Sequence, residues 1–331
     1  MTIRTAALAA TLALAAAPSL AQDTTEVRFG TNWRAQAEHG GFYQAVADGT
    51  YEACGLKVEI LPGGPQVNNR ALMIAGKVDF VMGGGLLNAF SAVQEGIPLK
   101  VVAAIFQKSP SAILSHPGEV SSFEELAERT HLVTDIGFQS YYQWLIAEKG
   151  FSAEKRAPYT FNPAPFLADK SLTQQGFVTS EPYAIEREAG FAPDVWLLSD
   201  HGYKPYSTTI ETMSQTIEER PEVVECFVEG SILGWANYLH GDNAAANDLI
   251  KADNPDMTDD KIAFAIRTMK ERGIVESGDA IEKGIGVVTP EAVQAFHDQM
   301  VEAGVMEPLD DVSAVFDASF VGKGVAVELR K

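Results

Sequence analysis

The feature that most constrains the fold is a regular alternation of short β-like runs with helical patterns near the start of the chain. Strand-like runs are expected at residues 26–30, 56–61, 78–82 and 99–106. Helical patterns between them are expected at residues 38–49, 65–76 and 86–95. Such a β–α–β rhythm predicts a parallel sheet covered by helices.

The rhythm restarts after residues 108–110, which predicts a second, smaller α/β lobe at 111–205. Its expected strands are 112–115 and 132–134, and its expected helices are 123–128, 139–149 and 181–188. Runs at 196–198 and 207–213 read as strands that carry the chain back to the first lobe, before long helices at 216–239, 244–253, 258–271 and 290–303.

We therefore expect an α/β protein with two lobes joined by crossover hinge segments. Lobe 1 would comprise residues 22–110, and the return at 206–331 would complete it with C-terminal helices. Ligand sites in open α/β sheets lie beyond the carboxyl ends of the strands, so two such edges would face each other. Closure about a hinge is a standard use of this arrangement.

The first 22 residues have the pattern of a secretory signal peptide. Arg4 precedes an Ala/Leu-rich run, and small residues precede an expected cleavage after Ala21, so residues 1–21 would be removed. Pro18 interrupts a run already too short to span a bilayer. No cysteine lies at the cleavage point, so a free periplasmic protein is expected.

The charge of the mature chain excludes several partners. Once Arg4 is removed with the leader, 24 basic residues face 45 acidic ones and the net charge is −21. Nucleic acid and anionic lipid both demand clustered Lys and Arg, so neither is expected as a partner. An anionic ligand is not excluded, because screening leaves the local donors of a pocket to decide.

Two cysteines, Cys54 and Cys226, are 172 positions apart. They could pair in an oxidising compartment, but buried or unpaired thiols are the interpretation we favour. Two isolated cysteines without a neighbouring Cys or His make a poor zinc site, and no metal is expected.

Polar and aromatic residues follow the first expected strand. Asn32 and Trp33 come at its end, where an indole could stack on a flat ligand or pack at the edge of a lobe. His39, Gly40 and Tyr43 lie at the start of the next helix, where free backbone N–H groups accept polar ligand atoms. His39 could equally be a cap or a structural hydrogen-bond donor.

A glycine triplet follows the third expected strand. Gly84 and Gly85, within this triplet, could form a tight strand-to-helix turn. The triplet is not a phosphate-binding Walker loop, because no Lys-Ser or Lys-Thr follows it.

These residues, with GTYEACGLKVEI, GKVDFVMGG and EGIPLKVVAA, resemble the SsuA/TauA-like superfamily of periplasmic binding proteins. The similarity is closest to the branch that binds thiamine pyrimidine precursors, formylaminopyrimidine and hydroxymethylpyrimidine, and that shares its fold with yeast pyrimidine synthases. It covers residues 27–104 well and 176–187 and 206–236 more loosely. It implies a type II periplasmic-binding fold and an ABC permease and ATPase as partners. A monomer without a cofactor is also expected.

The resemblance also implies roles for single residues. Trp33 and Tyr43 would frame a heteroaromatic ring, with polar contacts from Asn32 and His39. The backbone at Gly84 and Gly85 would face the ligand.

In the second lobe, the segment TSEPYAIER resembles the place where this branch carries an acidic residue at the cleft. Glu181 could accept hydrogen bonds from an exocyclic amino group, or could only support a helix N-terminus. Tyr183 would close over the ring. Further aromatic residues at 138–145 are as compatible with a core as with a pocket.

The ligand expected is a neutral or cationic heterocycle, because only Arg34 and Lys108 offer fixed cations near the expected cleft. An alkylsulfonate, a nitrate-like anion or a flavin are the alternatives. A pyrimidine-synthase-like enzyme is the alternative of another class, but the chain lacks both the cysteine-rich iron site of those synthases and the common catalytic motifs. A purely structural module would leave Trp33, His39 and Tyr43 without a shared purpose.

Overall fold

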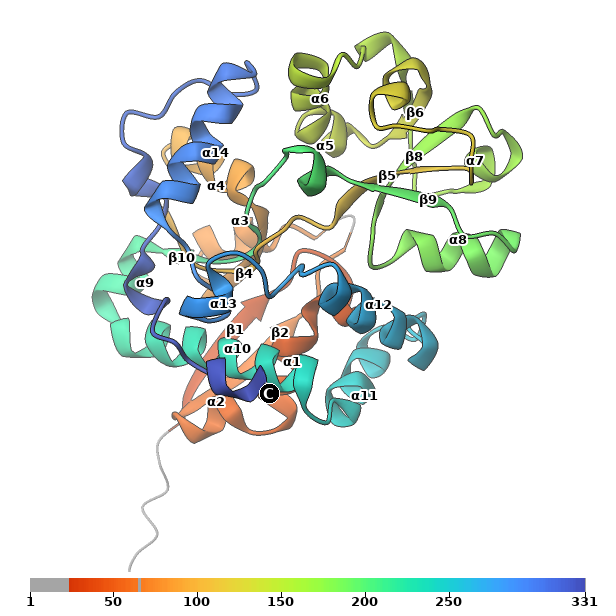
Figure 1. Ribbon diagram of the computed structural model, residues 1–331. Helices are drawn as coiled ribbons and strands as arrows, with labels where there is room; N and C mark the ends of the chain where they lie inside the picture. Colours follow the sequence, from red (N-terminus) through yellow and green to blue (C-terminus); the bar gives the residue numbers. More distant parts are fainter. Residues whose placement is uncertain (1–23, 65–66, 331) are drawn as a thin grey trace, which may run out of the picture.

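The computed structural model describes residues 24–64 and 67–330, and it has two α/β lobes that lie side by side (Figure 1). Each lobe is built on a five-stranded sheet. The two-lobed α/β class predicted from the sequence is confirmed. The expected leader, residues 1–21, lies outside the described residues.

The sheet of the first lobe has the strand order β2-β1-β3-β10-β4. Its strands are β1 (Thr25–Gly30), β2 (Leu56–Leu61), β3 (Phe80–Gly85), β4 (Leu99–Phe106) and β10 (Ser207–Met213). Strand β1 is parallel to β2 and β3, but β10 is antiparallel to both β3 and β4. The four strands of the expected β–α–β rhythm run in the same direction, and the antiparallel strand is β10, which enters this sheet from the second lobe at the carboxyl end of its neighbours.

The sheet of the second lobe has the order β7-β6-β8-β5-β9. Its strands are β5 (Ser111–Ser115), β6 (Thr130–Val133), β7 (Arg156–Pro158), β8 (Leu172–Phe177) and β9 (Asp194–Leu197). Strand β5 runs antiparallel to β8 and β9. The run expected at 196–198 as a way back to the first lobe is part of edge strand β9, and β10 alone makes the return.

Helices cover both sheets. The second lobe carries α5 (Asp135–Phe138), α6 (Tyr141–Lys149), α7 (Ala164–Ala168) and α8 (Glu181–Ala189). The first lobe carries α1 (Gly40–Ala47), α2 (Thr50–Ala53), α3 (Asn69–Ile74), α4 (Leu86–Gln94), α9 (Ser214–Glu219), α10 (Pro221–His240), α11 (Ala244–Asp253), α12 (Asp259–Glu271), α13 (Ala280–Lys283) and α14 (Pro290–Glu302).

Local sequence sets several of these helix ends. The side chains of Thr258 and Thr289 accept backbone N–H bonds at the starts of α12 and α14. The single helix expected at 216–239 is two helices, because Pro221 disfavours the helical conformation at Arg220, which has φ −141° and ψ 52°.

Helix α10 forms the centre of the core in the first lobe. The ring of Phe227 lies 4.2 Å from that of Phe80 and 5.2 Å from that of Phe29, both on the sheet. Tyr51 of α2 stacks on the same ring at 5.3 Å. Aromatic rings packed in this way hold α10 firmly across the sheet.

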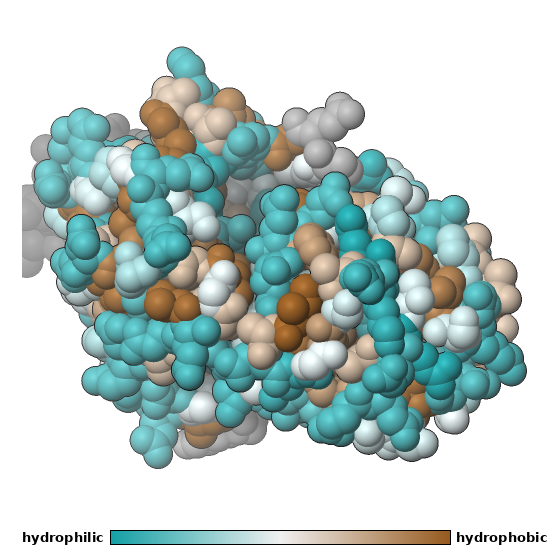
Figure 2. Space-filling model, turned by 90° about the horizontal axis from the view of Figure 1, so that it is seen from above, coloured by the Kyte–Doolittle hydropathy of each residue, from teal (hydrophilic) through white to brown (hydrophobic). Residues whose placement is uncertain are grey.

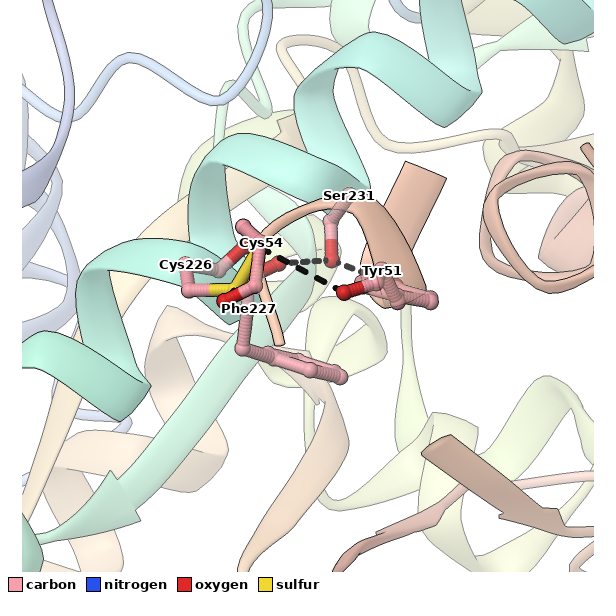
Figure 3. Close-up of a disulfide and its surroundings, with 5 residues drawn as sticks. All are labelled: Tyr51, Cys54, Cys226, Phe227 and Ser231. Carbon is pink, nitrogen blue, oxygen red and sulfur yellow. Dashed lines mark hydrogen bonds between the residues drawn. A yellow bond between two sulfur atoms is a disulfide. The ribbon is translucent and has the colours of Figure 1, made fainter. Parts of the chain in front are cut away.

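Cys54 and Cys226 form a disulfide that ties the end of α2 to α10, with their Cα atoms 6.0 Å apart (Figure 3). The Tyr51 hydroxyl lies 2.8 Å from the Ser231 hydroxyl one turn further along α10. The interpretation of unpaired thiols is therefore wrong. Sequence separation hid the pairing, which arises because α2 and α10 pack together in the fold.

Two crossover segments, residues 107–110 and 198–206, join the lobes. The backbone N–H groups of Gln107 and Lys108 both donate to the Ile274 carbonyl, at 2.8 and 3.1 Å. Gln299 of α14 donates to the Gly202 carbonyl at 3.1 Å. The C-terminal segments of the first lobe thus hold both crossovers in place.

The surface of the molecule is mostly hydrophilic when seen from above, and apolar residues gather on it in small patches (Figure 2). Among the described residues, no helix is both long enough and apolar enough to cross a bilayer.

Candidate functional site

Trp33 lies where the two lobes meet. The loop that carries it, directly after β1, is fixed by hydrogen bonds to the Trp33 carbonyl from the Thr31 hydroxyl at 2.8 Å and the Gly63 N–H at 3.0 Å. The indole is partly exposed, and its ring centroid lies 5.4 Å from that of Phe161 in the second lobe. The neighbouring Asn32 is exposed.

Phe161 follows β7 and is 58% exposed despite its size. Its φ of 61° is in the left-handed region, which is unusual for a bulky residue. Its ring also lies 5.6 Å from that of Tyr159. Trp33, Phe161 and Tyr159 therefore form an aromatic series that crosses from one lobe to the other.

Glu38 makes a direct hydrogen bond between the lobes. It lies in a short 3₁₀ helix (Ala37–His39), is only 5% exposed, and accepts a hydrogen bond from the hydroxyl of Thr179, which is in the second lobe. Burial raises the pKa of Glu38, and the Thr179 hydrogen bond opposes that rise. Sequence reasoning missed Glu38, because an acid in the first turn of a helix is ordinary.

Glu181 brings a second carboxylate to the same place. It begins α8 and accepts a hydrogen bond from the Phe177 N–H at 2.6 Å. Burial raises its pKa to about 7, hydrogen bonds from backbone N–H groups lower it, and the nearby charge of Glu38 adds to the rise. Glu181 is two residues after Thr179, whose hydroxyl donates to Glu38 across the lobe junction.

His39 is fully buried at the start of α1. Neither of its ring nitrogens has a hydrogen-bond partner among the described residues, and burial lowers its pKa to about 3. Gly40 is needed for close packing, because a Cβ there would lie 2.0 Å from the Tyr238 ring of α10. In this arrangement, both residues face the interior of the first lobe.

Tyr43 is also packed inside the first lobe. It is 3% exposed, and its hydroxyl donates to Asp253 at the end of α11 at 2.7 Å. Tyr43 therefore does not form one ring-binding frame with Trp33 in this arrangement. The reason is that α1 and α11 pack closely together and enclose its ring.

The glycine triplet was expected to follow the third strand. In the structure it is part of β3 itself. A Cβ at Gly83 would lie 1.9 Å from the Glu211 carboxylate. Gly84 is exposed at the carboxyl end of the sheet, beside Asn88. Gly85, with φ 154°, lies against the Tyr206 carbonyl at the second crossover, so it supports the hinge.

Tyr183 takes part in a separate contact between the lobes. Its ring lies 5.4 Å from that of Phe264 on α12. The guanidinium of Arg187 lies 6.0 Å from the Tyr183 ring, and that of Arg267 lies 5.4 Å from the Phe264 ring. These four residues line a groove of about 710 Å³ that does not include Trp33, Glu38 or Glu181.

We call Tyr183, Arg187, Phe264 and Arg267 the outer contact. The inner contact comprises Trp33, Glu38, Phe161, Thr179 and Glu181. A further groove of about 810 Å³ separates α11 from α12 and includes none of the predicted site residues. A ligand held at the inner contact would therefore enter when the lobes move apart about the crossovers.

No group of three or more His, Cys, Asp or Glu side chains in the described part of the chain is placed to hold a metal ion. The chemical resources of the inner contact are aromatic faces, two carboxylates and one hydroxyl. This set can stack a flat ring and accept hydrogen bonds from it.

Two mixed-sheet lobes joined by crossovers form the fold of the periplasmic binding proteins, and solved structures share it. A putative sulfonate-binding protein SsuA from Methylobacillus flagellatus has a TM-score of 0.62 at 14% identity, over 93% of this chain and 95% of that one. The nitrate-binding protein NrtA from Synechocystis gives 0.60 at 11% identity, over 90% and 87%. The Candida albicans CA3427 product gives 0.58 at 17% identity, over 89% and 96%.

Sequence comparison is more specific about the family. The NMT1/THI5-like family matches residues 36–245, and the chain belongs to this family. No curated protein matches the sequence. The matched region includes Glu38, His39 and Tyr43 of the first lobe and Thr179 and Glu181 of the second.

Proposed function

We propose that the mature chain is a periplasmic substrate-binding protein that captures a small heteroaromatic solute, of the thiamine pyrimidine-precursor class, and delivers it to an ABC importer. Membership of the NMT1/THI5-like family and the two-lobed fold support the general role. The observations that carry the ligand class are two contacts between the lobes, the Trp33–Phe161 ring pair and the Glu38–Thr179 hydrogen bond, with Glu181 two residues after Thr179.

An aminopyrimidine suits this set of groups. Its flat ring can stack on Trp33, which is worth roughly 0.5–1.5 kcal/mol beyond the area buried. Its exocyclic amino group can donate to Glu38 or Glu181, and a hydrogen bond to a charged acceptor contributes roughly 1.5–3 kcal/mol. Both interactions need the lobes to close on the ligand.

The nearby cations favour this ligand over a sulfonate or nitrate. The Arg70 guanidinium binds both Glu211 oxygens, at 2.7 and 3.0 Å. The side chain of Arg34 is exposed and lies 3.9 Å from Asp256. An anion at the inner contact would therefore meet two carboxylates and compete with other acids for these guanidinium groups.

Two features support the proposed periplasmic location. The leader pattern and the Cys54–Cys226 disulfide both suit an oxidising compartment such as the periplasm. We propose that the protein acts there as a monomer, without a cofactor, and passes its ligand to the permease and ATPase of an importer.

A ligand panel tests the proposal. The mature protein is mixed with hydroxymethylpyrimidine, formylaminopyrimidine, an alkanesulfonate, nitrate and riboflavin, and thermal stability and calorimetric binding are measured. An aminopyrimidine should raise the melting temperature with increasing concentration, because bound ligand stabilises by mass action. Stabilisation by the sulfonate, nitrate or flavin alone would reject the ligand class.

The same samples separate a receptor from a synthase-like enzyme. After denaturation, a receptor returns its ligand chemically unaltered, and mass spectrometry of the supernatant shows this directly. Recovery of a converted product would reject the receptor role.

A further inference from the structure

We propose that Glu38 determines which ligand charge the site accepts. With Glu181 it forms a two-carboxylate site across the lobe junction, and this site favours a cationic ligand over a neutral one and rejects an anion. This inference rests on the proposed function, because it concerns the same site. It adds a residue that neither the sequence pattern nor the family resemblance singled out.

The position of Glu38 carries the argument. The hydrogen bond that its carboxylate accepts comes from Thr179, on the opposite lobe. This bond exists only while the two lobes are in contact, and in that arrangement Glu38 is 5% exposed. A buried carboxylate needs compensation by hydrogen bonds or an opposite charge. A ligand that brings a donor or a positive charge supplies that compensation upon closure.

Glu181 increases the need for a compensating positive charge. Thr179, which donates to Glu38, is only two residues before Glu181, and the charge of Glu38 adds to the rise in the pKa of Glu181. The two charges raise each other's free energy when both are ionised, and a positive group between them relieves this repulsion. An additional negative charge would increase it.

The protein groups around Glu38 and Glu181 do not carry enough positive charge to compensate both carboxylates. Lys261 of α12 acts on both carboxylates, but more weakly than the other influences on each. His39 is held neutral by burial, and Tyr159 and Tyr238 keep their protons because burial raises their pKa values. One ammonium therefore faces two carboxylates.

The test uses three ligands that share one ring and differ in charge. They are 4-amino-2-methylpyrimidines with an aminomethyl, hydroxymethyl or carboxylate group at position 5. Calorimetry at neutral pH should show the aminomethyl compound binding the wild-type protein at least about tenfold more tightly than the carboxylate, with the hydroxymethyl compound between them.

The variant Glu38→Gln keeps the shape and the Thr179 contact but removes one charge. It should reduce the ratio of aminomethyl to carboxylate affinity by about tenfold, while the hydroxymethyl compound changes less. The matched controls are Glu95→Gln in the first lobe and Glu154→Gln in the second, which remove the same charge from exposed positions. Both controls should leave the ratio unchanged, since exposed charges are screened.

The outcomes distinguish this inference from the proposed function. Equal wild-type affinity for all three ligands, or a Glu38→Gln ratio equal to that of the controls, would overturn the role of Glu38 and leave ring binding intact. Failure of all three ligands to bind the wild-type protein, checked as folded by circular dichroism, would instead overturn the proposed function.

Discussion

The inner and outer contacts join the same two lobes with different chemistry. The inner contact includes a hydrogen bond between two buried residues, Glu38 and Thr179, and the aromatic pair of Trp33 and Phe161. The outer contact is a partly exposed ring pair, Tyr183 and Phe264, with an arginine on each ring.

This difference suggests that the two contacts have separate roles in ligand binding. Buried carboxylates are sensitive to the charge and hydrogen-bonding pattern of whatever lies against them, whereas ring and guanidinium contacts at a surface add attraction with little selectivity. We therefore expect the inner contact to decide which ligand binds and the outer contact to set how long the lobes stay closed. A ligand's apparent affinity depends on both, because it includes the population of the closed state.

The largest effect is expected from Trp33→Ala, which removes the stacking surface of the inner contact. Aminopyrimidine affinity should fall at least about tenfold, since both ring stacking and buried area are lost. Calorimetric titration measures this, and Trp33→Phe should restore part of the affinity. Unchanged affinity in a folded Trp33→Ala protein would remove Trp33 from the site.

Tyr43→Phe provides the contrast within the same lobe. The substitution deletes the hydroxyl that donates to Asp253 but keeps the buried ring. We expect a change in aminopyrimidine affinity of less than about twofold, with a loss of stability near 1 kcal/mol. Chemical denaturation checks the stability, and a large loss of affinity would bring Tyr43 back into the ligand site.

An effect smaller than that of Trp33→Ala is expected at the outer contact. Tyr183→Ala and Phe264→Ala should each weaken binding about threefold, and together little more than either alone, because both remove the same ring pair. Stopped-flow measurements should show faster dissociation, with the same factor for every ligand that binds. Glu186→Ala, which lines the same groove without contributing a ring, serves as the control.

If the change in dissociation rate caused by Tyr183→Ala or Phe264→Ala differed from one ligand to another, it would contradict these separate roles of the two contacts. Such a difference would show that the outer contact takes part in selection, so that the two contacts form one site.

The smallest effect concerns pH and Glu181. Its pKa is raised from 4.5 to about 7 in the folded protein, so folding favours the protonated form. This stabilisation is complete below pH 4.5 and is lost as the pH rises through 7. Glu181→Gln cannot ionise, so its melting temperature should exceed that of the wild type by roughly 2–4 °C above pH 7. The difference should vanish towards pH 4.5.

Comparing the wild type with Glu181→Gln separates the effect of Glu181 on stability from that of His39. The lowered pKa of His39 makes the folded state less stable as the pH falls, but it does so in both proteins and cancels in the difference. Calorimetric scans across this pH range provide the measurement. A pH-independent difference would show that the Glu181 carboxyl is not perturbed in solution.

Much of the fold could be predicted because its strands are short apolar runs. Strands β2, β4 and β10 have the bounds expected from the sequence alone. Strand β8 was harder to see, since its sequence, LTQQGF, contains two glutamines and no apolar alternation. The disulfide was hidden because it depends on the packing of α2 on α10 rather than on local sequence.

The candidate site was only partly predictable for a similar reason. Trp33 and Glu181 follow the ends of strands, and the topology takes such positions to the lobe junction. The close packing at Gly40 and the burial of Tyr43 depend on α10 and α11, which come much later in the chain. No local pattern could show that these residues would be covered.

The antiparallel strand β10 has a consequence for how the chain matures. The first lobe uses both ends of the polypeptide, whereas the sheet of the second lobe comes from one continuous stretch, β5 to β9. Because the chain is made from its N-terminus, the second lobe can therefore fold before the first lobe is complete. The first sheet lacks the strand between β3 and β4 until β10 is added, and Cys226 follows β10 in the chain, so the disulfide can form before α11 to α14 complete the lobe.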